Sequence, residues 1–191
     1  MKHIYLIIAV LVSTMSYSQG GEIDAIPYYE VPEYSKEFTA GTMAARMVDA
    51  LGFRFYWSSE SLTEKDLAYK PSEDVRSTAE TIDHILDLSY IIVNSTLNRP
   101  NGKMDTSKMG YADKRKQALI NLKTAADILR ASDDISQYKI IFGENEVPFW
   151  NQVNGPIADS IWHCGQLASF RRTSGNPINP DVNHFRGTVK Q

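Results

Sequence analysis

The fold of this chain is decided by residues 77–97, which read STAETIDHILDLSYIIVNSTL. Ser77 and Glu80 form a capping box, a pattern that begins a helix because each side chain bonds the backbone N–H of the other residue. The apolar residues that follow cover more than one stripe of the helix, so we expect it to be well buried. Residues 98–102, NRPNG, end it, because proline, asparagine and glycine are helix breakers. The stretch therefore predicts one long, buried helix.

Three further segments repeat apolar residues at helical spacing, at about residues 39–59, 111–131 and 156–173. The last begins near Pro156, a favoured residue at a first helical position, and Gly175 beyond its end suits a left-handed cap. Four helices of similar length with polar joints are typical of a four-helix bundle. The joints after the first and third helices are long enough for crossovers. The predicted fold class is therefore all-α, a four-helix bundle with crossover topology.

A short insertion is expected before the last helix. Residues 138–142, YKIIF, and 147–150, VPFW, flank the polar residues 143–146, which predicts either a short hairpin or an irregular lid. Pro148 limits any strand here to an edge, because proline has no backbone N–H. Earlier in the chain, residues 61–73 are expected to form a loop with at most one helical turn.

The N-terminus has the pattern of a secretory signal peptide. Lys2 precedes an uncharged apolar run at residues 4–12, and Ser16 and Ser18 follow as the small residues of a cleavage site. The run is too short to span a bilayer, so we expect an exported chain, periplasmic or secreted, with a retained N-terminal anchor as the alternative. The predicted layout is a signal peptide over 1–18, an extended lead-in over 19–40 and one bundle domain over 41–187.

Composition excludes several classes of function. The chain has 20 basic and 23 acidic side chains, a net charge of −3, so nucleic acid is not an expected partner. Cys164 is the single cysteine, which excludes an internal disulfide and a cysteine-based zinc site. The partners left open are a small-molecule ligand and a second copy of the chain as a homodimer.

A polar ridge on the last predicted helix is the candidate site. Asp159, His163 and Gln166 stand at positions i, i+4 and i+7, so they lie on one face of the helix and could bind one metal ion or share a proton. His84 on the second predicted helix is the best third partner, and Glu80 lies one turn before it. We expect Gln166 or Glu80 to orient water or a ligand.

Each of these residues also has a structural explanation. A helical histidine beside apolar residues is more often a hydrogen-bonded boundary residue than a ligand. Asp159 would stabilise the first turn of its own helix through the helix dipole. Cys164 is turned about 100° from His163, so it is expected to pack against a neighbouring helix.

Several motifs are spread along residues 41–187 and read LGFRFYW (51–57), LTEKDL (62–67), RSTAETIDHI (76–85), GPIADSIWHCGQ (155–166), FRR (170–172) and GNP (175–177). Taken in this order, they resemble the DinB-like superfamily of metal-dependent proteins.

This resemblance implies a crossed-over four-helix bundle that holds a divalent metal through three histidines. His84 matches the first histidine and His163 the last, whereas Asp159 stands where the family usually has its middle histidine. Two histidines and one aspartate remain a ligand set for zinc, nickel, iron or manganese.

Two functions follow from these residues and the resemblance. The first is an exported metal-dependent hydrolase or transferase of unknown substrate, with His84, Asp159 and His163 as metal ligands. The alternative is a non-catalytic bundle that binds a small ligand or partner, in which the same residues form a structural hydrogen-bond network.

Overall fold

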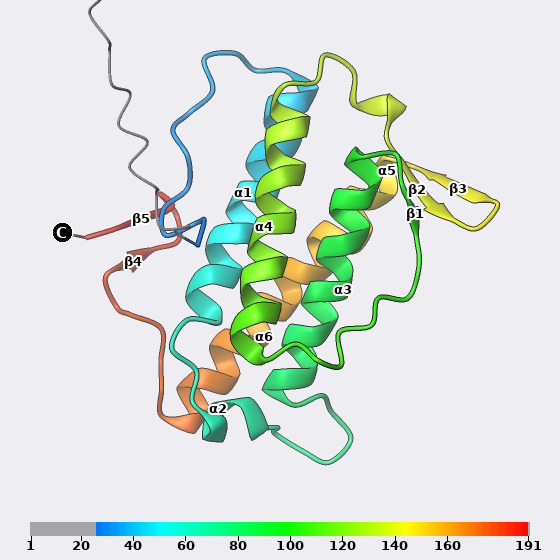
Figure 1. Cartoon of the computed structure of the whole chain (residues 1–191). Helices are drawn as coiled ribbons and strands as arrows, with labels where there is room; N and C mark the ends of the chain where they lie inside the picture. The colour runs from blue at the N-terminus through cyan, green and yellow to red at the C-terminus, as the bar shows by residue number, and fades with distance from the viewer. Residues whose placement is uncertain (1–25, 191) are drawn as a thin grey trace, which may run out of the picture.

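The computed structural model describes residues 26–190 and is mostly helical (Figure 1). Its long helices begin and end within about two residues of the bounds that the sequence predicts. They are α1 (Ala40–Ser58), α3 (Thr78–Thr96), α4 (Tyr111–Arg130) and α6 (Ala158–Ser174). The predicted signal peptide over 1–18 lies outside the described residues.

Apart from α3 and α4, the long helices that pack together are not consecutive in the sequence. α4 lies between α1 and α3 on one side of the molecule, and α6 contacts both α1 and α3 behind it (Figure 1). α1 and α3 thus each pack chiefly against α4 and α6. This arrangement brings α3 and α6, which are far apart along the chain, to the face that carries the candidate site.

Side chains from all of the long helices fill the core. Helix α4 contributes small residues, Ala118, Ala125 and Ala126, which are fully buried. Gly41 at the start of α1 lies so close to α4 that an added Cβ would be 2.4 Å from the carbonyl oxygen of Leu129. The close approach buries large apolar side chains, the main favourable term in folding. The fully buried large residues are Leu51, Phe53, Phe55, Ile82, Ile85, Leu86, Ile92, Leu119, Leu122, Leu129, Ile157 and Leu167.

Two connecting segments differ from the sequence expectation in detail. The segment expected as a loop with at most one turn contains α2 (Glu64–Ala68), begun by a capping box between Thr63 and Asp66. The last helix is preceded by α5 (Trp150–Gln152) and by a π-helical turn, η2 (Val153–Ile157). The α-helix itself therefore starts at Ala158, two residues after Pro156.

The insertion before α6 is a hairpin, so the irregular-lid alternative is not what the structure contains. Strand β2 (Lys139–Phe142) pairs antiparallel with β3 (Asn145–Pro148), which carries Pro148 at the sheet edge. A two-residue strand that the sequence did not predict, β1 (Pro100–Asn101), pairs parallel with the other side of β2. A second small pair, β4 (Val182–Asn183) and β5 (Thr188–Val189), lies in the C-terminal tail, and a 3-10 turn, η1 (Ile135–Gln137), precedes β2.

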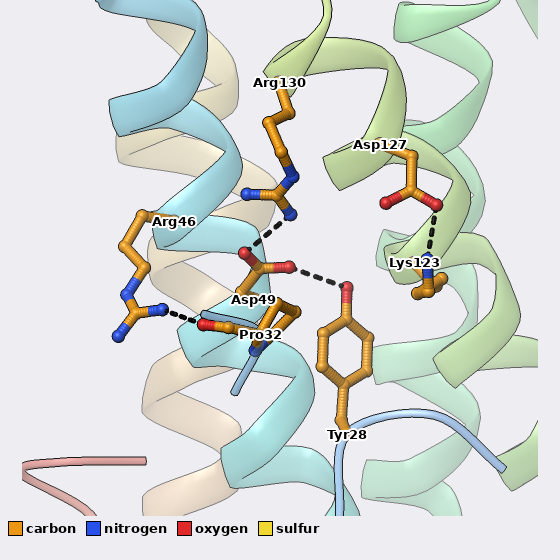
Figure 2. Close-up of polar contacts among 7 residues, drawn as sticks. All are labelled: Tyr28, Pro32, Arg46, Asp49, Lys123, Asp127 and Arg130. Atoms are coloured by element: carbon orange, nitrogen blue, oxygen red, sulfur yellow. Dashed lines mark hydrogen bonds and ion pairs between the residues drawn. The ribbon is translucent and has the colours of Figure 1, made fainter. Parts of the chain in front are cut away.

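Of the lead-in predicted over 19–40, residues 26–39 contain no helix or strand and lie against α1, whereas Ala40 already belongs to that helix. Figure 2 shows how polar contacts hold it: Tyr28 Oη donates to Asp49 Oδ1 at 3.3 Å, and Arg46 Nη1 donates to the Pro32 carbonyl at 2.7 Å. Asp49 is fully buried, and Arg130 Nη2 donates to its other oxygen at 2.9 Å. Burial raises the pKa of the Asp49 carboxyl, and the hydrogen bond from Arg130 opposes that shift.

Within residues 26–190, none of the helices combines the length and the apolar character needed to cross a membrane.

Candidate metal centre

The structure brings together three of the predicted site residues in what we call the His/Asp cluster: His84, Asp159 and His163. His84 projects from α3, while Asp159 and His163 lie one turn apart on α6. His84 Nε2 is 3.2 Å from Asp159 Oδ2, and His163 Nε2 is 3.4 Å from Asp159 Oδ1. One ligand atom from each residue lies within 4.8 Å of the other two. The aspartate therefore presents one oxygen to each imidazole.

The cluster lies at the rim of the core and is open on one side. The side chain of His163 is 10% exposed, that of His84 27% and that of Asp159 41%. The two imidazole rings meet edge to face, with centroids 4.8 Å apart and an interplanar angle of 85°. Small molecules can thus reach the cluster from the side of Asp159, whereas the side chains of the two histidines are more deeply buried.

Gln166 contacts the cluster as an orienting group for His163. Its Oε1 lies 2.6 Å from His163 Nδ1. Because an amide oxygen can only accept, Nδ1 donates in this contact, and in a neutral imidazole Nε2 then turns its lone pair toward Asp159. A lone pair and a carboxylate oxygen at 3.4 Å repel each other unless a cation or a proton lies between them.

Glu80, the other residue expected to orient a ligand, is engaged elsewhere. Its Oε2 accepts from the backbone N–H of Ser77 at 2.7 Å, and Ser77 Oγ in turn accepts from the Glu80 N–H. Hydrogen bonds from the backbone and the side chain of Ser77 lower the pKa of the exposed Glu80 carboxyl. The structure therefore places Glu80 in the cap of α3 and not among the residues of the His/Asp cluster.

The π-helical turn η2 directly precedes the aspartate. Gly155 has φ −100° and ψ −108°, a non-helical backbone between two helical stretches, and Pro156 follows it. Turns of this kind inside helices are frequently found at functional sites. The sequence signal for this irregularity is the Gly155-Pro156 pair, from which helical patterns alone predict only a helix start.

An apolar groove adjoins the cluster at Asp159. It has a volume of about 690 Å³ and lies between α3, the β2–β3 hairpin and the segment from η2 into α6. Asp159 lines both the groove and the cluster. The groove was not predicted, because its walls come from segments whose contact no local sequence pattern encodes. The apolar residues that form most of its walls are Leu88, Ile91, Ile140, Val147, Pro156 and Trp162.

Two other reactive side chains lie outside the site. Cys164 is buried, as expected for a packing residue, and burial raises the pKa of its thiol to about 12, so it is not a thiolate nucleophile at neutral pH. His184 packs edge to face on Phe53, with ring centroids 5.8 Å apart, and takes no part in the His/Asp cluster.

Comparisons of this chain with models of protein families, with curated proteins and with solved structures find no match.

Proposed function

We propose that this chain is an exported, DinB-like four-helix bundle with crossover topology in which His84, Asp159 and His163 hold a divalent metal ion. The reaction that suits this site is metal-dependent hydrolysis or group transfer on a small molecule. Export is supported by the sequence of residues 1–18 alone, and the family by the motifs shared with DinB-like proteins.

The observation that carries the proposal is the position of Asp159 between two imidazoles. Two ligands of a tetrahedral zinc ion, each bonded at about 2.1 Å, are separated by about 3.4 Å. The separations from Asp159 to His84 and His163 are 3.2 and 3.4 Å. The donor set of two neutral nitrogens and one carboxylate also suits zinc, nickel, iron and manganese.

The surrounding side chains favour a ligand role for His163. Gln166 holds the Nδ1 proton, which leaves Nε2 free to bind a cation, and such partners orient most metal-binding histidines. The exposure of Asp159 leaves room for a further ligand on the groove side. When bound, a divalent ion would act as a Lewis acid that polarises a substrate oxygen or lowers the pKa of a water molecule.

The second candidate is a non-catalytic bundle in which the same residues form a hydrogen-bond network. The direct contact of 3.2 Å between His84 and Asp159 supports it, since this distance suits a hydrogen bond without an ion. A network that includes His163 forms in two ways: a protonated imidazole donates from Nδ1 to Gln166 and from Nε2 to Asp159, or a neutral imidazole donates from Nε2 to Asp159 while the Gln166 amide is turned by 180° and donates to Nδ1.

Metal analysis of purified protein decides between these two functions. We expect about one divalent ion per chain in the parent protein, and a specific ion should raise its melting temperature, because only the native state binds it. His84→Ala and His163→Ala should each lose the ion. His184→Ala is the matched control, since it removes a histidine outside the cluster, and it should keep the ion. A parent protein without a stoichiometric ion, or a His163→Ala variant that retains it, would contradict the metal site.

A further inference from the structure

We propose that the apolar groove binds the uncharged hydrocarbon part of a small amphiphilic molecule whose single oxygen-bearing polar end lies at Asp159. This inference rests on the proposed function for the chemistry at the polar end, since it names the substrate class of that site. The binding of the hydrocarbon part depends on the groove alone.

The groove is continuous with the His/Asp cluster along α3. His84, Leu88 and Ile91 are spaced by four and then three residues, so they form one ridge of that helix. The histidine belongs to the cluster, and the next two residues line the groove. A molecule whose polar end lies at the cluster therefore meets only apolar side chains as it extends along this wall.

The hairpin forms the opposite wall with one of its faces. Ile140 of β2 is directly paired with Val147 of β3, so both side chains lie on the same face of the hairpin, and both line the groove. Ile141, the next residue of β2, points to the other face because side chains alternate along a strand. The hairpin thus presents a row of branched apolar side chains to the groove.

The charges on the groove define the chemistry of its occupant. Among residues 26–190, Asp159 is the only charged residue that lines it, and the other polar side-chain groups there are the amides of Asn151 and Asn154 and the indole N–H of Trp162. No lysine or arginine of this described part of the chain lines the groove to pair with an anionic group along its length. Because an unpaired charge is costly to remove from water, the part of the ligand that lies in the groove must be uncharged.

The size of the groove favours a small molecule as the occupant. Its volume of about 690 Å³ falls within the range of about 300–1,000 Å³ that is usual for small-molecule sites. Trp162 stands beside Asp159 with 72% of its surface exposed, and a hydrocarbon chain laid along the groove would cover part of that ring. Removing apolar surface from water on both partners would drive such binding.

Four simple probes test this inference by isothermal titration calorimetry. Octanamide and octanohydroxamate share one hydrocarbon chain, but only the hydroxamate chelates metals; acetamide and acetohydroxamate are their short counterparts. We expect octanamide to bind the parent about a hundredfold more tightly than acetamide, with a negative heat-capacity change from apolar burial. Octanamide should bind His163→Ala equally well, because its chain does not require the metal. Octanohydroxamate should bind the metal-loaded parent more tightly than octanamide does.

A matched pair of hairpin variants locates the binding site. Val147→Asp adds a charge to the groove face and should weaken octanamide binding by about tenfold or more, with the metal content unchanged. Ile141→Asp adds the same charge to the other face of the hairpin and should bind as the parent does. Equal binding by the two variants would overturn the inference, as would octanamide that binds no more tightly than acetamide.

The two proposals fail in different ways. If the protein binds a metal ion but binds octanamide no more tightly than acetamide, the groove inference is wrong and the proposed metal centre is unaffected. If the parent protein contains no metal ion but binds octanamide more tightly than acetamide, the proposed metal centre is wrong and the groove inference is supported. Octanohydroxamate that binds no better than octanamide in the metal-loaded parent would show that the polar end does not lie at the cluster, and so would overturn the orientation proposed here.

Discussion

Asp159 is the residue on which the site depends, because it lies at a helix start, contacts both histidines and borders the groove. It lies in the first turn of α6, where a negative charge is favoured by the helix dipole. Its two oxygens contact the imidazoles of His84 and His163, and its exposed side borders the groove. The helix-dipole interpretation and the ligand interpretation are therefore compatible in this structure.

Gln166→Leu should weaken metal binding by about 10- to 100-fold, the usual cost of losing a partner that orients a metal-binding histidine. The substitution keeps a similar volume but removes the acceptor for the Nδ1 proton of His163. Titration of the metal-free protein with zinc against a competing chelator measures the change.

Gln166→Glu is the matched control for this prediction, because it retains an oxygen acceptor in the same place. It should keep most of the metal affinity. If Gln166→Leu binds zinc as tightly as the parent does, Gln166 has no orienting role.

The sequence predicted the individual site residues better than it predicted their surroundings. Spacing alone placed Asp159, His163 and Gln166 on one face, because helical periodicity is a local property. His84 was predicted as third partner only from its place on another helix, and helical spacing could not establish its contact with Asp159, which spans 75 residues of chain. Glu80 shows the opposite case: the capping box that marked the helix start also occupies the carboxylate expected to orient a ligand.

At the level of secondary-structure elements, the strongest local signals gave the most accurate bounds. The capping box at Ser77 begins α3 one residue later, and Gly175 ends α6 with φ 92°, as a left-handed cap does. α2 was underestimated although Thr63 and Asp66 carry a similar signal, because five residues contain too little apolar periodicity to be recognised. The parallel pairing of β1 with β2 is a tertiary contact between two short strands, and no sequence pattern predicts it.

Two glycine substitutions on helices should have opposite effects on stability. An added Cβ at Gly52 of α1 would lie 2.4 Å from the ring of Tyr28, so Gly52→Ala should lower the free energy of unfolding by about 1 to 3 kcal/mol and loosen residues 26–38. At Gly165 of α6 a Cβ would meet nothing within 4 Å, so Gly165→Ala should raise the free energy of unfolding by about 0.4 to 1 kcal/mol.

Chemical denaturation measures both changes, and limited proteolysis reports on residues 26–38. Gly165→Ala serves as the control for Gly52→Ala, because both replace a helical glycine by alanine. A Gly52→Ala protein as stable as the parent, with the same proteolysis rate, would mean that the ring of Tyr28 does not pack on α1 as the structure has it.

On the scale of the whole molecule, Asp66 joins distant parts of the chain. Its carboxylate accepts hydrogen bonds from Thr63 at the start of α2, from Ser174 Oγ at the end of α6 and from Asn176 Nδ2 in the tail. Arg171 completes this junction by donating to the carbonyls of Trp57 and Asn176. The contacts from α6 and the tail to Asp66 each span more than 100 residues of chain.

Because of this junction, part of the free energy of unfolding depends on pH. Burial alone would raise the pKa of Asp66, but the hydrogen bonds from Ser174, Asn176 and Thr63 outweigh it and hold the pKa far below its usual value. Since the folded state favours the carboxylate, the contribution is present above the unfolded-state pKa of about 3.9 and is lost as the pH falls below it.

Asp66→Asn should therefore lower the free energy of unfolding by about 1 to 3 kcal/mol at pH 7, and the difference from the parent should shrink below about pH 4. Urea denaturation at several pH values measures it. Glu64→Gln, on the same short helix, is the control and should follow the parent closely. A difference between Asp66→Asn and the parent that stays constant from pH 7 to pH 3 would contradict this assignment.

The central place of β2 in its small sheet bears on how a ligand would enter and leave the groove. β2 is bonded to β3 on one side and to β1, which closely follows α3, on the other. The wall that carries Ile140 is thereby tied to the helix that forms the opposite wall, so it has no free hinge. We expect ligand exchange to follow a single concentration-dependent phase in stopped-flow measurements, limited by diffusion along the open groove and not by a slow opening of the hairpin.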